Sequence, residues 1–98
     1  MERYSSRTID ELGRIVLHNE LREKLNLSTN DKFYLKLVDT LLILQRTVDK
    51  TLEDCTTCAI DELGRVNLPN VLRKKLCWDT SDKVAVYHTD NLIILKLA

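Results

Sequence analysis

The hexapeptide IDELGR at residues 9–14 occurs a second time at residues 60–65, 51 positions later in a chain of 98 residues. In each copy the Asp can accept hydrogen bonds from the backbone ahead of it, and the Gly tolerates a positive φ. The hexapeptide therefore predicts a tight turn between two strands. Two identical turns in so short a chain indicate that a larger unit has been duplicated.

The match continues well beyond the hexapeptide. Nineteen residues are identical between segments 7–44 and 58–95. Outside the two hexapeptides they are Leu17, Asn19, Leu21, Arg22, Lys24, Leu25, Thr29, Asp31, Lys32, Asp39, Leu41, Ile43 and Leu44, with their counterparts 51 positions later. We call these two segments the first and the second repeat.

Each repeat reads as two strands, a short helix and a hairpin. Apolar residues alternate at Ile15 and Leu17, which predicts a strand with one buried face, and Leu21 and Leu25 lie four apart, which predicts a helix. Hairpins are predicted at 32–37 with 41–45 and at 83–88 with 92–96. The predicted fold class is mainly β with short helices, from two β-β-α-β-β repeats.

A unit of about 40 residues cannot bury enough apolar surface to fold alone. We therefore expect the two repeats to cover each other as one pseudo-dimeric domain. The predicted division is a first repeat at residues 1–46, a connector at 47–54 and a second repeat at 55–98.

Composition excludes several classes of protein. The longest apolar run has four residues, Leu41 to Leu44, so no membrane span and no signal peptide is predicted, and we expect a cytoplasmic protein. The formal net charge is zero, with 15 basic and 15 acidic residues, so any nucleic-acid binding must come from charges gathered on one face. Phosphate loops, nucleophile elbows and paired carboxylates with a His are absent from the sequence; we expect neither an enzyme nor a cofactor.

The three cysteines admit more than one interpretation. Cys55 and Cys58 form a lone CxxC, which with Cys77 and His88 could be a zinc site or a redox pair. Residues three apart on a strand point to opposite faces, which suits a metal site badly. We therefore predict no metal. Cys77 is expected to be a small buried residue, and Trp78 to pack on the core.

The order of these motifs resembles the AbrB/SpoVT superfamily of swapped-hairpin proteins. The resemblance rests on the two hexapeptides, Leu68-Pro69, the Leu-Arg helices and the closing Ile93-Ile94-Leu95-Lys96. It covers almost the whole chain and implies a β-barrel of interleaved hairpins capped by two helices. Members of the superfamily include transcription regulators, MazE-type antitoxins and MraZ, which also carries two copies per chain.

The resemblance implies a DNA-binding transcription regulator that contacts duplex DNA through a basic face. Cys58 and Glu23 depart from the family pattern, because they stand where Arg7 and Lys74 stand in the other repeat. Arg14 and Arg65 could instead pair with Asp10 and Asp61, or with the neighbouring glutamates, and only hold the turns. The residues that the resemblance assigns to DNA are Arg7, Arg14, Arg22, Arg65, Arg73 and Lys74.

Two alternatives use the same fold without DNA. One is an antitoxin; such proteins follow the barrel with a tail that wraps the toxin, whereas the second repeat here runs to Ala98, so a toxin partner is not expected. The other is a protein-assembly module that forms a homo-oligomer.

Overall fold

The computed structural model describes residues 2–46, 56–89 and 92–98, and in them the order strand, strand, helix, strand, strand occurs twice. The predicted connector at 47–54 lies outside the described residues. The elements of the first repeat are β1 (Glu2–Thr8), β2 (Arg14–Val16), α1 (Asn19–Lys24), β3 (Lys32–Val38) and β4 (Leu41–Gln45). Those of the second are β5 (Thr56–Ala59), β6 (Arg65–Asn67), α2 (Asn70–Leu76), β7 (Lys83–His88) and β8 (Leu92–Leu97).

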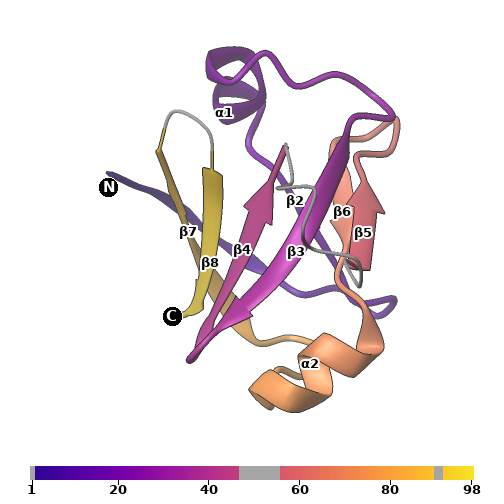
Figure 1. Ribbon diagram of the computed structural model, residues 1–98, viewed down its shortest axis with the longest axis vertical. Helices are drawn as coiled ribbons and strands as arrows, with labels where there is room; N and C mark the ends of the chain where they lie inside the picture. The colour runs from indigo at the N-terminus through magenta and orange to yellow at the C-terminus, as the bar shows by residue number, and fades with distance from the viewer. Residues whose placement is uncertain (1, 47–55, 90–91) are drawn as a thin grey trace, which may run out of the picture.

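The strands form a curled antiparallel half-barrel sheet of six strands, in the order β1-β7-β8-β4-β3-β5, and a separate ladder of β2 and β6 (Figure 1). Within this arrangement β1 pairs with β7, β5 with β3, β8 with β4 and β6 with β2, and each of these pairs joins the two repeats. The hairpins β3–β4 and β7–β8 pair within a repeat. Because most of these ladders join the repeats, a repeat on its own would keep the ladder of its hairpin and lose those of its other strands.

The core lies between the curled sheet and the β2–β6 ladder. At its centre Leu42 and Leu44 of β4 are in register with Leu95 and Ile93 of β8, and all four are buried. Along β4 every second residue is buried, as alternation in a strand requires, whereas β7 and β8 each bury three consecutive residues, 84–86 and 93–95. The other large side chains that are fully buried are Ile9, Ile15, Leu17, Leu21, Phe33, Ile60, Val66 and Leu68.

The two helices lie at opposite ends of the molecule along its longest axis (Figure 1). Both start with the same backbone geometry, φ −57° and ψ 140° at His18 and φ −57° and ψ 138° at Pro69. The fixed φ of proline is thus matched by an unconstrained residue in the first repeat. In the segments that the structure describes, no helix has the length and apolar character that crossing a membrane would require.

Each helix is followed by a residue in the left-handed region, Asn26 with φ 54° and Cys77 with φ 58°. Asn suits this position, as predicted, whereas Cys does so only at a steric cost. The prediction that Cys77 is buried was wrong, because this thiol is exposed. The chain reverses at Cys77, and it is the next residue, Trp78, that enters the core at 3% exposure.

Candidate nucleic-acid interface

The first turn is held by the Asp10 carboxylate. Its Oδ1 accepts hydrogen bonds from the backbone N–H groups of Leu12 at 3.0 Å and Arg14 at 2.8 Å. Its Oδ2 accepts a third bond from Arg14 Nε at 2.8 Å, which also makes an ion pair. Gly13 closes the turn with φ 78°, a conformation that glycine adopts without strain.

The second turn repeats these bonds. Asp61 accepts from the backbone of Leu63 at 2.9 Å and of Arg65 at 2.8 Å, and from Arg65 Nε at 2.6 Å. In both repeats partial desolvation acts to raise the pKa of the aspartate. The hydrogen bonds from the arginine and leucine, together with the arginine charge, outweigh it, so that the pKa of Asp10 and Asp61 lies below its ordinary value.

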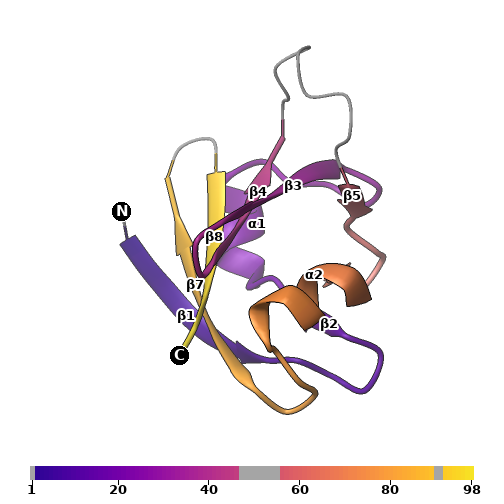
Figure 2. The same cartoon turned by 60° about the horizontal axis from the view of Figure 1, so that its bottom comes forward.

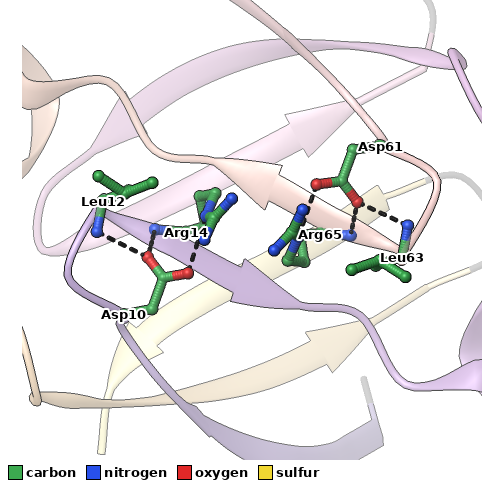
Figure 3. Close-up of polar contacts among 6 residues, drawn as sticks. All are labelled: Asp10, Leu12, Arg14, Asp61, Leu63 and Arg65. Carbon is green, nitrogen blue, oxygen red and sulfur yellow. Dashed lines mark hydrogen bonds and ion pairs between the residues drawn. The ribbon is translucent and has the colours of Figure 1, made fainter.

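The two ion pairs lie side by side because β2 and β6 pair in antiparallel register. Arg14 is opposite Asn67, and Val16 is opposite Arg65. The intervening pair, Ile15 and Val66, is buried, so alternation turns the other four side chains outward. We call Arg14, Val16, Arg65 and Asn67 the outer ladder face. Figure 3 shows both arginines of this face between the two aspartates.

Arg22 and Arg73, which the resemblance assigns to DNA, each lie against a turn of the other repeat. Arg73 Nε donates to the Leu68 carbonyl at 2.9 Å, and its guanidinium lies so close over Gly13 of the other repeat that a Cβ there would be 2.4 Å from Arg73 Cζ. Arg22 lies over Gly64 in the same way, and a Cβ on Gly64 would be 2.5 Å from Arg22 Cζ. These arginines lock each helix onto the opposite turn. The sequence contains the identical Arg and Gly in both repeats, but nothing in it says that they meet.

Arg7 and Lys74, the other two residues that the resemblance assigns to DNA, are not part of the outer ladder face. Arg7 is half-buried in β1 opposite Val84, and in the described part of the chain its buried Nε has no hydrogen-bond partner. Lys74 is exposed on α2, next to the exposed Lys75. The structure thus brings Arg14 and Arg65 onto one face and places Arg22 and Arg73 beneath the flanking turns.

Exposed apolar residues that sequence reasoning did not single out lie on the two turns, on β2 and at the start of α2. Leu12 and Leu63, at the tips of the two turns, are 64% and 65% exposed. Val16 of the outer ladder face is 40% exposed and Val71 at the start of α2 is 64% exposed. For Leu12 and Leu63 the signal in the sequence was an apolar residue inside each hexapeptide, at a turn position where polar residues are usual.

The cysteines do not come together with His88 in the described residues. Cys58 is buried in β5, where burial raises the pKa of its thiol to about 12, whereas Cys77 is exposed. Cys55, the other member of the CxxC, lies outside the described residues. Within residues 2–46, 56–89 and 92–98 there is no cluster of three or more His, Cys, Asp or Glu that could hold a metal ion.

Comparison with known proteins shows the fold and no family. No protein-family model matches the sequence, and no curated protein matches it. Among solved structures, the chain is similar to the solution structure of PHS018 from Pyrococcus horikoshii, with a TM-score of 0.55 and 16% sequence identity. The similarity covers 96% of this chain and 86% of that one. At this identity the likeness speaks for the arrangement of the strands and helices.

Proposed function

We propose that this protein is an AbrB-like DNA-binding transcription regulator in which two repeats of one chain form the swapped-hairpin barrel. The ladders that join the repeats, β2 with β6 and β4 with β8, support the barrel assignment. The duplicated hexapeptide supports the kinship. Duplex DNA is the partner, and Arg14 and Arg65 are the central contacts.

The observation that carries this proposal is the pair of guanidinium groups on the outer ladder face. Their side chains are 25% and 27% exposed, and each is held through Nε by its own aspartate. A guanidinium bound at Nε keeps its two terminal NH₂ groups in a fixed plane, with the fork geometry that phosphate and guanine accept. Asp10 and Asp61 therefore orient the arginines. Each aspartate also neutralises the charge of the arginine with which it pairs.

Because the two pairs are neutral, the remaining attraction to DNA has to come from other cations. Lys74 and Lys75 on α2 and the half-buried Arg7 are the candidates. If four or five phosphates are neutralised, the logarithm of the affinity should fall against the logarithm of the salt concentration with a slope of about −4.

The test is the double variant Arg14→Ala with Arg65→Ala, measured by fluorescence anisotropy against a pool of random duplexes at several salt concentrations. Binding should be lost while the far-ultraviolet circular dichroism spectrum is kept, because exposed ion pairs contribute only about 0–1 kcal/mol to stability. The matched control is Lys32→Ala with Lys83→Ala, which removes the same charge from exposed positions shared by both repeats. Equal binding by both double variants would contradict the proposal.

A further variant separates a lost contact from uncompensated negative charge. Asp10→Asn and Asp61→Asn, added to the arginine double variant, remove the carboxylates that would otherwise repel phosphate. If binding stays lost in this variant, the arginines contact DNA directly. If binding returns to the wild-type value, they serve only to balance the aspartates.

The second candidate function is a protein-assembly module. The exposed Leu12 and Leu63 beside an electrically balanced face favour it, since protein interfaces are poor in unpaired charge. Sedimentation of the purified chain tests it. An assembly that falls apart in the variant Leu12→Ser with Leu63→Ser would support this function, and a monomer at all concentrations would contradict it.

A further inference from the structure

The two helices next to the proposed DNA site carry different charge, although their backbones are alike. Helix α1 has the sequence NELREK, in which Glu20 and Glu23 balance Arg22 and Lys24. Helix α2 has the sequence NVLRKKL, with three cations in its last turn and no acidic residue. The positions that differ in charge are Glu20 against Val71 and Glu23 against Lys74.

A cleft lies between the start of helix α2 and the outer ladder face. This open cleft is lined by Leu12 of the first turn, Asn67 of β6 and Pro69, Asn70 and Arg73 of the second repeat. Asn67 belongs to the outer ladder face, so this cleft connects the face to the helix that carries Lys74 and Lys75. In Figure 2 helix α2 is turned toward the viewer.

Two residues of this region have no matching group in the first repeat: Asn67, which lines the cleft, has no polar equivalent, and Lys74, which is exposed on α2, has no cationic one. Asn67 offers an amide that can donate and accept hydrogen bonds, whereas its counterpart Val16 offers none. Lys74 offers a cation to phosphate, and its counterpart Glu23 repels it. Arg7 runs against this asymmetry, because its counterpart is the buried Cys58.

We propose that the second repeat anchors the phosphate backbone and the first does not, so that the protein binds duplex DNA in one orientation on a site without two-fold symmetry. The inference rests on the proposed function. It deepens that function by stating the kind of duplex that is bound: a pseudo-symmetric fold here reads an asymmetric site. The two turns supply equivalent arginines, whereas α1 and α2 attract the phosphate backbone unequally.

Charge exchange between matched positions tests the anchor. Lys74→Glu gives the second repeat the residue of the first, and Glu23→Lys gives the first repeat the residue of the second; both positions are exposed. We expect Lys74→Glu to weaken binding roughly tenfold at 0.1 M salt and to make the salt slope shallower by about 1. Glu23→Lys should strengthen binding, and the double exchange should restore the affinity to within about threefold.

Orientation is tested by cleavage from a single exposed thiol. Cys77 follows α2 directly and is exposed, while Cys58 is buried with a thiol pKa of about 12, so in a Cys55→Ser background an iron chelate can be attached at Cys77. On duplexes selected from the random pool, cleavage is expected on one side of the bound site. The control variant Lys32→Ala with Lys83→Ala, at exposed positions outside the proposed contact, should leave that side unchanged.

The outcomes separate the two proposals. If the wild-type chain binds no duplex at 50 mM salt, the proposed function fails and this inference fails with it. If the chain binds, but Lys74→Glu has no effect or cleavage is equal on both sides, only the asymmetric anchor is overturned.

Discussion

The turn at residues 10–14 and the turn at residues 61–65 are built from the same bonds, whereas the helices that follow them differ in charge, in burial and in their end residues. In both turns the aspartate accepts two backbone N–H groups and one arginine Nε, the last at 2.8 Å in the first repeat and 2.6 Å in the second. Helix α1 buries Leu21 completely, while no residue of α2 is buried.

The difference follows from where the repeats touch each other. Leu17 donates its backbone N–H to the carbonyl of Gly64, and Leu68 donates to Gly13, so each turn supports the helix entrance of the other repeat. A change in one turn disturbs a contact with the opposite repeat. Residues that face solvent carry no such reciprocal contact and can differ between the repeats.

The largest effect is expected where a turn and a helix of different repeats meet. Gly13→Ala and Gly64→Ala each put a Cβ into a guanidinium and strain a backbone at φ 78° or 77°. We expect each to lower the free energy of unfolding by about 2 kcal/mol, about 1 from the left-handed conformation and about 1 from the hydrogen bond that the displaced arginine loses. Urea unfolding measures this loss, which should be equal in the two repeats.

A double-mutant cycle shows whether the arginine is the cause. In an Arg73→Ala background, Gly13→Ala should cost only the backbone strain, about 1 kcal/mol. If Gly13→Ala costs the same with and without Arg73, the lock between helix and turn does not contribute to stability.

The next effect concerns the aspartates. Asp10→Ala and Asp61→Ala each remove three hydrogen bonds in a partly exposed turn, and we expect each to destabilise the protein by about 1 kcal/mol. Asn at the same position keeps an acceptor for the backbone N–H groups and should cost less. Thermal unfolding of the four variants tests whether the two turns are equivalent. A loss of stability confined to the variants of one repeat would contradict this equivalence.

Acid should weaken both turns together. The pKa of Asp10 and Asp61 is lowered in the folded state, so their contribution to stability is complete above the unfolded pKa of about 4 and is lost as pH falls through the folded pKa. From these two groups we expect constant stability between pH 8 and 5 and a small loss by pH 3, because both carboxylates are about one-third exposed and solvent screens their ion pairs. Urea titrations at pH 7, 5 and 3 measure it, and Asp10→Asn with Asp61→Asn should flatten the acid limb.

The smallest effect is expected at the helix ends, where the repeats differ. Cys77→Asn gives α2 the left-handed residue that follows α1, and we expect a gain of about 0.5 kcal/mol because Asn tolerates φ 58° better than Cys. The reverse change, Asn26→Cys, should cost a similar amount. Thermal unfolding of both variants sharpens the comparison, and a loss of stability in Cys77→Asn would contradict it.

Particular residues show how far the sequence could predict this structure. Ile15 and Leu17, two apart, were predicted to share a buried face and do so, and the predicted hairpin strand 41–45 has the bounds of β4. Local alternation suffices for such predictions because side-chain direction in a strand repeats every two residues. Cys77 was predicted wrongly, because its exposure depends on a left-handed backbone that a cysteine does not signal.

The candidate site was predictable only in part. The ion pair of Arg14 with Asp10 lies within five residues and was foreseen as one reading of the turn. The lock of Arg73 on Gly13 joins residues 60 positions apart, and no local pattern encodes such a distance. Nor did the sequence indicate that Leu12 of the first repeat and Asn67 of the second would line the same cleft.

By itself the sequence determined that this chain is a duplication, that each copy turns at Asp-Glu-Leu-Gly, and which strand residues face the core, because these properties depend on neighbours in the chain. Only the tertiary structure decided that strands of one repeat pair with strands of the other. It also decided that Arg22 and Arg73 clamp the opposite turns while Arg14 and Arg65 share one face. These contacts depend on how two copies dock, and docking is set by packing over the whole core rather than by any single stretch of residues.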